Sequence, residues 1–210
     1  MPRKKSEHCR LAILRACLKV LDEKGYLDLT IEEVASKAQA GKQTVYRHFG
    51  SKARLALEAF THITDQAVPE DTGSLGADLQ SFLHERIERV DFPKKRQMVS
   101  GLLAEAQCDP DFAACFRQTY VKAHRRPVRT IFRRAIARGE VDPEANIELF
   151  VDLLFGPWLY RLLATGDSID PQFATELSFA VAHAATLTAP PLARPHRDED
   201  VATPRRVMRS

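Results

Sequence analysis

The sequence predicts an all-α fold, with a small helical domain at the N-terminal end and a larger helical domain after it. Apolar residues recur at spacings of three and four along most of the 210 residues, and the strict alternation typical of strands is almost absent. Residues that begin and end helices are frequent. Three Asp-Pro pairs are among them, because Asp is a strong N-cap and Pro is favoured in the first helical turn.

Two helices are predicted before residue 40. The first begins after Ser6 as its cap and ends at Gly25, since glycine readily adopts the left-handed backbone that closes a helix. Leucines three and four apart give it an apolar face. The second begins at Thr30, whose hydroxyl is in capping-box register with Glu33. A turn of three or four residues, too short for anything else, comes after it.

Residues 41–52, GKQTVYRHFGSK, predict a short third helix of unusual composition. Only Val45 and Phe49 are apolar, and their spacing of four places them on one face. The other faces carry hydrogen-bonding side chains. Gly41 can cap this helix and Gly50 can end it, and the serine after Gly50 can cap a fourth helix.

Residues 30–49 therefore have the pattern of a helix-turn-helix, two helices joined by a tight turn. The second helix of that motif enters the major groove of DNA, and its first residues reach base edges. We expect Lys42 and Gln43 to meet base edges, and Thr44, Tyr46, His48 and Lys52 to meet phosphates. A solvated surface helix is the alternative, but it would more often carry Glu and Lys than a Tyr-Arg-His cluster. The predicted DNA-contacting residues are Thr30, Gly41, Lys42, Gln43, Thr44, Tyr46, Arg47, His48 and Lys52.

The charge distribution agrees with a polyanionic partner for the N-terminal part. Residues 1–60 carry 12 Lys and Arg against 7 Asp and Glu, whereas residues 61–188 carry 14 against 18. The net charge of the whole chain is only +3, so the asymmetry between its parts is the informative feature.

The rest of the chain also reads as helices. The pairs that begin at Asp109, Asp142 and Asp170 each predict a helix start, and Gly139 is expected to close the helix from Pro110. Pro127 should kink or break that helix. Weaker helical segments lie near residues 75–90 and 94–107, and residues 189–210 are rich in proline and poor in large apolar residues, so they are expected to be disordered.

The stretch LTIEEVASKAQAGKQTVYRHFGSKARL, residues 29–55, resembles the TetR-type transcriptional regulators. The shared features are the capped Thr-Ile start, Tyr-x-x-Phe and the Gly-Ser-Lys directly after it. The turn departs from the family, which usually has Ala-Gly-Val-Ser where this chain has Ala38-Gln39-Ala40-Gly41. Gln39 must therefore tolerate whatever backbone the turn demands.

The resemblance implies a DNA-binding domain at residues 7–67, with its helix-turn-helix at 30–49, and a helical effector-binding and dimerisation domain at 75–188. It further implies a cytoplasmic homodimeric repressor that binds a pseudopalindromic operator in double-stranded DNA and is released by a small-molecule effector. The residues implied for the effector pocket are Phe82, Met98, Leu102, Phe116, Tyr120, His124 and Trp158. Those implied for the dimer interface are Phe150, Leu154, Trp158, Phe173, Leu177, Ala180 and Ala184. For both sets the alternative is the hydrophobic core of a single subunit.

Other function classes find little support in the sequence. It contains no triad motif, phosphate loop or paired carboxylates, and its four cysteines lack C-x-x-C spacing, so we expect no enzyme activity, cofactor or metal. No apolar run approaches the length of a membrane span, and no signal-peptide core comes after the basic start. A helical protein-interaction module remains an alternative, which DNA binding in the presence of heparin would separate from a regulator.

Overall fold

The chain folds into helices. The computed structural model describes residues 2–63, 69–88 and 92–187, and these ranges contain no strand. The predicted all-α fold is confirmed, while the predicted disordered tail, residues 189–210, lies outside the described residues. The α-helices are α1 (Pro2–Lys24), α2 (Ile31–Lys37), α3 (Lys42–Phe49), α4 (Lys52–Ile63), α5 (Leu75–Glu88), α6 (Phe92–Cys108), α7 (Pro110–Phe116), α8 (Lys122–Ala137), α9 (Ile147–Tyr160) and α10 (Pro171–Thr186), with π-helical turns η1 (Arg117–Val121) and η2 (Arg161–Thr165).

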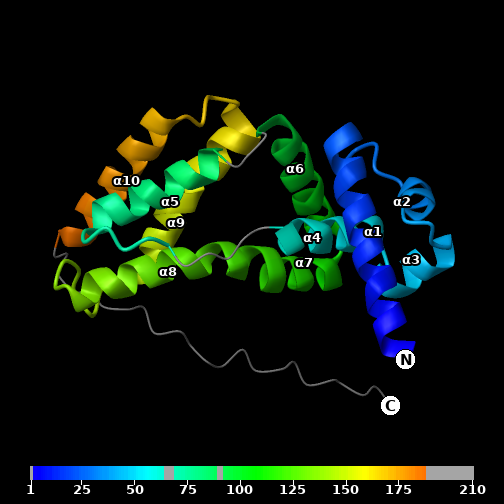
Figure 1. Ribbon diagram of the computed structural model, residues 1–210. Coiled ribbons are helices and arrows are strands. Elements are labelled where there is room, and N and C mark those ends of the chain that lie inside the picture. The colour runs from blue at the N-terminus through cyan, green and yellow to red at the C-terminus, as the bar shows by residue number, and fades with distance from the viewer. Residues whose placement is uncertain (1, 64–68, 89–91, 188–210) are drawn as a thin grey trace, which may run out of the picture.

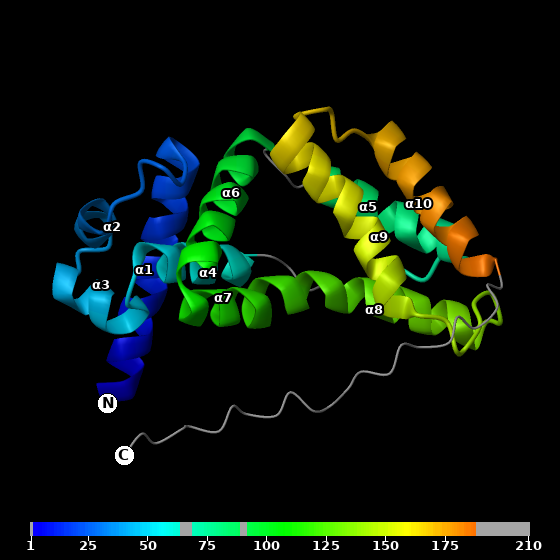
Figure 2. The ribbon, with the colours of Figure 1, turned by 180° about the vertical axis from the view of Figure 1, so that it is seen from behind.

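The helices gather at two ends of the molecule (Figures 1 and 2). α1, α2 and α3 lie at one end, and α5, α9 and α10 lie at the other. α8 packs against both α5 and α9. α4 packs against α1 and α3 and also against α6, α7 and η1, and so connects the N-terminal helices to the middle of the molecule. Buried apolar side chains from all of these helices form one connected core.

Most of the predicted helix ends are confirmed, but α1 begins at Pro2 and so contains Ser6, which was predicted to cap it. Thr30 accepts a hydrogen bond from the amide of Glu33 at 3.3 Å, and Asp109 and Asp170 accept amide bonds at the starts of α7 and α10. The Glu33 carboxylate, however, lies 2.8 Å from Nζ of Lys24. The second half of the predicted capping box is thus replaced by an ion pair between α2 and α1.

The helix start predicted at Asp142 is wrong. α9 begins at Ile147, with Asn146 as its N-cap accepting from the amide of Leu149 at 3.3 Å. Asp142 instead accepts from the amide of Glu144 at 2.8 Å and closes a turn. Asp before Pro suits a turn as well as a helix start, and the sequence pattern does not distinguish the two.

Pro127, at which a kink or a break was predicted, does not break the helix. Pro127 is buried within α8, which continues through it without interruption. The irregularity lies earlier, at the π-helical turn η1, so that α7, η1 and α8 succeed one another directly along the chain. A second π-helical turn, η2, comes directly after α9, which contains Pro157. Such turns insert one extra residue into a helix and often occur at functional sites.

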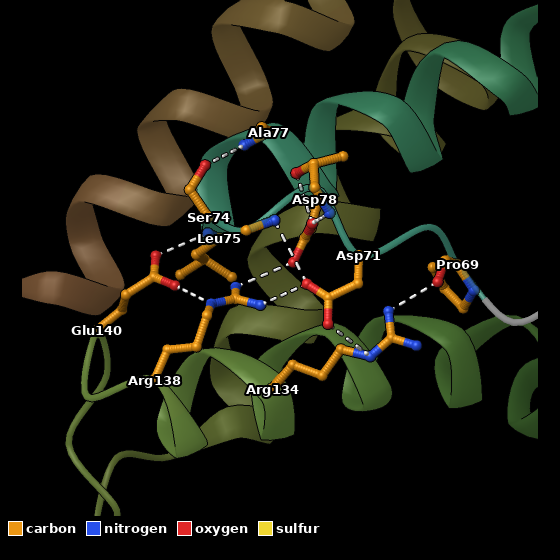
Figure 3. A network of polar contacts seen from close by, with 11 residues as sticks. Pro69, Asp71, Ser74, Leu75, Ala77, Asp78, Arg134, Arg138 and Glu140 are labelled. Atoms are coloured by element: carbon orange, nitrogen blue, oxygen red, sulfur yellow. Dashed lines mark hydrogen bonds and ion pairs between the residues drawn. The ribbon is translucent and has the colours of Figure 1, made fainter.

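A buried carboxylate fixes the segment that enters α5 (Figure 3). Asp78 is fully buried and accepts from both the amide and the hydroxyl of Thr72 at 2.6 Å. Its second oxygen accepts from Nη2 of Arg138, just beyond α8, at 3.0 Å. Each polar atom of this carboxylate therefore has a partner, which is the condition under which a buried charge is tolerated.

Glu140 and Arg134 extend this network on either side of Asp78 (Figure 3). Glu140 accepts from the amide of Leu75 at 2.7 Å and so caps α5 from outside the helix. Arg134 donates to the carbonyl of Pro69 at 2.7 Å. The two contacts tie residues 69–75 to the end of α8.

Candidate nucleic-acid interface

Helix α3 is held by its two apolar residues and exposes the rest of its surface. Val45 is 0% exposed and Phe49 is 5% exposed, as their spacing predicts. Gly41 is the N-cap, and no side chain caps the first turn of α3. Gly50 ends the helix with a φ of 77°, a backbone conformation that favours glycine.

The turn before α3 contains a strained residue. Gln39 has a φ of 53° and is the only residue other than glycine with a positive φ in the described ranges. This is the position at which the family usually has glycine, and the turn does require Gln39 to adopt the left-handed backbone conformation that favours glycine. A side chain in the left-handed region costs roughly 1–2 kcal/mol. The turn nevertheless delivers the chain to the start of α3.

Gln43 and Arg47 are the most available side chains of α3. Both are exposed, and neither makes a hydrogen bond or an ion pair within the described part of the chain. They are four apart and therefore lie on one face of the helix. Tyr46 beside them is 45% exposed, while Thr44 and His48 are partly buried. This face can reach an external partner without any rearrangement.

Lys42 is exposed but already paired. Its ammonium group forms an ion pair with the Glu32 carboxylate of α2. That contact raises the pKa of Lys42 and lowers the pKa of Glu32. Lys42 must leave Glu32 before it can bind a base or a phosphate, a competition that the sequence pattern does not reveal. The two residues are ten apart and meet only because α2 and α3 pack together.

Lys52 and Thr30 have structural roles in this conformation. The ammonium group of Lys52 lies 4.8 Å from the centre of the Tyr26 ring and donates to the carbonyl of Leu27 at 3.0 Å. Burial lowers the pKa of Lys52. The Thr30 hydroxyl caps α2. The DNA contacts predicted for these two residues therefore require their side chains either to move or to share their present partners.

A groove lies behind α3, between the start of α4 and α6. It encloses about 580 Å³ and is lined by residues that include Tyr26, Tyr46, Lys52, Glu105 and Cys108. Tyr26 also packs against Gly101 of α6. The groove therefore lies between the helix-turn-helix and α6.

The residues predicted for an effector pocket do not all come together. Tyr120 stacks on His124 and Phe116, with ring centres 4.0 Å and 5.0 Å apart, and on Phe60 of α4 at 5.9 Å. Trp158 instead packs against Phe173, 6.5 Å away. Phe82, Met98, Leu102, Phe116, His124 and Trp158 are buried, and Tyr120 is partly exposed. Sequence reasoning missed Phe60 and Arg86, which lie beside this cluster.

The predicted dimer residues lie mostly inside the subunit. Leu154 is 0% exposed in the single chain, and Trp158, Phe173 and Leu177 are 6–8% exposed, so they have almost no surface to offer a partner. Phe150 and Ala184 are partly exposed, and Ala180 is exposed. α9 packs against α8 and α10 on the side that was predicted to face the partner. Its opposite side exposes three large apolar residues, namely Leu149, Leu153 and Tyr160, and Leu163 of η2 is exposed after them.

Comparison with known proteins identifies the family. Residues 13–59 match the bacterial regulatory proteins of the tetR family, and residues 69–181 match the tetracyclin repressor-like C-terminal domain. The chain belongs to the TetR family. This TetR-family protein is 35% identical over 150 residues to the HTH-type transcriptional regulator Mb1581 of Mycobacterium bovis, a match that covers 71% of this chain and 73% of the relative.

Two further relatives of this TetR-family protein cover more of its length. It is 28% identical over 176 residues to the HTH-type transcriptional regulator YdeS of Bacillus subtilis, which covers 83% of this chain and 88% of YdeS. The crystal structure of the TetR family transcription regulator SCO0332 has a TM-score of 0.72 at 30% identity, covering 83% of this chain and 97% of the other. The protein is accordingly a DNA-binding, helix-turn-helix transcriptional regulator.

The described residues of this TetR-family regulator support neither a metal site nor a membrane-spanning helix. No group of three or more His, Cys, Asp or Glu side chains in those ranges is placed to hold a metal ion. None of the described helices combines the length and the apolar content that a membrane span requires.

Proposed function

We propose that this TetR-family regulator is a homodimeric repressor that binds a pseudopalindromic operator and leaves it when a small molecule binds. The observation that carries the proposal is the exposed, unpaired pair of Gln43 and Arg47 on a helix anchored by Val45 and Phe49. Gln suits the edge of adenine and Arg suits the edge of guanine in the major groove. The regulator would act in the cytoplasm, where an operator is accessible.

The remaining predicted contacts support phosphate binding. The start of α3 has no side-chain cap, and the open amides of a helix N-terminus favour phosphate. Thr44, Tyr46 and His48 come later on the same short helix. Phosphate contacts of this kind fix the position of the helix on the duplex, and base contacts then select the sequence.

The exposed apolar faces of α9 and α10 support the proposed homodimer. Leu149 is 50% exposed, Tyr160 is 64% exposed and Phe179 of α10 is 56% exposed. Ala180 lies exposed beside Phe179 and would allow close approach of a second copy. Apolar residues gathered on two adjacent helices are typical of a surface that a partner covers. A two-fold dimer would present two copies of α3 to half-sites about 34–36 Å apart or further.

The aromatic cluster of Phe60, Phe116, Tyr120 and His124 supports an effector site. It joins α4, the next helix after α3, to α7, η1 and α8. A molecule bound there would contact the helix that adjoins the helix-turn-helix, and so has a physical route to change DNA affinity.

Selection from randomised DNA tests the proposal. The purified protein is incubated with a pool of random duplexes and excess heparin, and the retained sequences are read. We expect a pseudopalindrome whose affinity falls steeply between about 50 and 200 mM salt, because several phosphates per dimer release counterions. Retention of no duplex in heparin would refute operator binding and favour a protein-interaction module. A single unpaired half-site would refute the dimer.

A further inference from the structure

Arg86 of α5 lies against the aromatic cluster and has no carboxylate partner. Its guanidinium carbon is 4.6 Å from the centre of the Phe82 ring. Within the described residues, no carboxylate lies within 4.0 Å of Arg86, and the side chain makes no hydrogen bond. The contact with Phe82 satisfies the charge in part, but it occupies none of the five N–H donors of the guanidinium.

Arg86 is deep in the protein, but the residue as a whole is only partly buried. Burial lowers the pKa of Arg86, with the charges of Tyr120 and Glu85 opposing the change. Burial likewise raises the pKa of Tyr120 to about 12, with Arg86 opposing it. Both side chains nevertheless remain partly exposed. The surface that these two side chains keep is where a bound molecule would contact them.

Several other partly buried arginines, in α8 and just beyond it, do have carboxylate partners. Arg125 and Arg129 both bind the Glu148 carboxylate, and Arg138 binds Asp71 and Asp78. Partly buried arginines are usually matched in this way, because an uncompensated charge in the interior costs several kcal/mol. Arg86 therefore stands as a cation whose anionic partner the described chain does not supply.

We propose that the effector is an organic anion whose carboxylate, or an equivalent charged group, binds the Arg86 guanidinium while its apolar body packs beside Phe82, Tyr120 and Phe60. The proposal rests on the effector-binding function proposed above. A guanidinium presents donors in a planar fork that matches the two oxygens of a carboxylate. The surrounding rings supply the apolar surface that a small-molecule site requires.

Matched probe pairs test the charge requirement. Sodium benzoate, naphthoate and decanoate are each compared with the corresponding primary amide at constant ionic strength, and the Tm of the full chain is recorded. A ligand that binds only the folded protein raises the Tm. We expect at least one carboxylate to raise the Tm clearly more than its amide does. Equal shifts within every pair, or no shift with any probe, would overturn the proposal.

Substitutions then locate the charge. Arg86→Met should abolish the difference between carboxylate and amide, and without any probe it should leave the Tm unchanged or raised, because an uncompensated cation is removed. Arg86→Lys should keep part of the difference, since it retains the charge. Arg133→Met removes an exposed arginine of α8 and should keep the full difference between carboxylate and amide. An undiminished carboxylate preference in Arg86→Met would refute the site. If Arg86→Met does not fold, the carboxylate preference of Arg86→Lys is compared with that of Arg133→Met, and equal preferences would refute the site.

Binding of the selected operator distinguishes a failure of this proposal from a failure of the proposed repressor function. A protein that binds its operator but prefers no carboxylate would refute the anion site alone. A carboxylate that binds at Arg86 without weakening the operator complex would leave the anion site in place and refute release by that effector.

Discussion

Tyr26 and Gly101 are in direct contact: a Cβ atom built on Gly101 would lie 2.2 Å from Cε1 of the Tyr26 ring. Tyr26 lies just beyond α1 and is only 7% exposed, and Gly101 lies in the middle of α6. The missing side chain at residue 101 is therefore what allows this ring to reach α6. The contact couples the N-terminal helices to a helix of the C-terminal part.

Gly101→Ala should lower stability despite a better helix propensity. Alanine gains about 0.5–1 kcal/mol over glycine in a helix interior, but here it forces the Tyr26 ring to move. We expect a lower Tm, with operator affinity changed as Tyr26 shifts. Gly76→Ala is the control, because a Cβ there meets only ordinary contacts at 3.6 Å and beyond. A Tm of Gly101→Ala at or above that of the wild type would show that the ring moves aside at little cost.

Gln43→Ala should relax base preference at one position of each half-site. If Gln43 makes a bidentate contact with a base, its loss costs about 1–3 kcal/mol and spares the other positions. The measurement is the selected sequence pattern together with the affinity for the wild-type operator. Gln107→Ala removes an exposed glutamine of α6 and serves as the control. An unchanged pattern in Gln43→Ala would assign base recognition to Arg47.

Leu153→Glu and Leu154→Glu should behave differently although the residues are neighbours. Leu153 is 42% exposed, whereas Leu154 is 0% exposed. Leu153→Glu should give a folded helical monomer that no longer binds the operator. Leu154→Glu should unfold the subunit, because it places an unpaired charge in the core. Light scattering and circular dichroism distinguish the outcomes, and a dimeric Leu153→Glu that still binds would move the interface elsewhere.

The ion pairs of Glu148 should make part of the stability depend on pH. Hydrogen bonds from Arg129 and then Arg125 lower the pKa of Glu148 from 4.5 to about 2. The contribution of the Glu148 ion pairs to the free energy of unfolding is therefore complete above the ordinary carboxyl pKa and is lost as the pH falls toward 2. Half of the side chain is exposed, so solvent screening makes the effect smaller than the shift suggests. The Tm difference between wild type and Glu148→Gln should be largest at neutral pH and shrink between about pH 5 and pH 2, and a constant difference would contradict this.

Local patterns predicted the helix-turn-helix well because its signals are local. The cap at Thr30, the anchors Val45 and Phe49, and the glycine that ends α3 all act within a few residues of each other. Asp142 shows the limit of such signals, because Asp-Pro is equally suited to a turn and the choice depends on the residues beyond it. Predicting that an element exists is therefore easier than predicting where it starts.

The candidate sites were harder to predict because they depend on which side of a helix meets which neighbour. α9 is apolar on several sides, so its sequence could not show that Leu154 faces the subunit and Leu153 faces outward. The pairing of Lys42 with Glu32 requires the packing of α2 on α3. Arg86 was missed for the same reason, since only the tertiary structure reveals that no described carboxylate lies beside it.

The ion pair between Lys42 and Glu32 bears on how such a regulator distributes itself over a chromosome. Every duplex offers phosphates, so an unengaged Lys42 would strengthen binding to all sequences alike. Glu32 must release the lysine first, which weakens each chance encounter, while the proposed base contacts of Gln43 and Arg47 are unaffected. If Lys42 contacts phosphate in every duplex, this competition lowers the affinity for the operator and for unrelated sites by the same factor. More molecules then stay free of DNA, while the preference for the operator, set by the proposed base contacts, is unchanged.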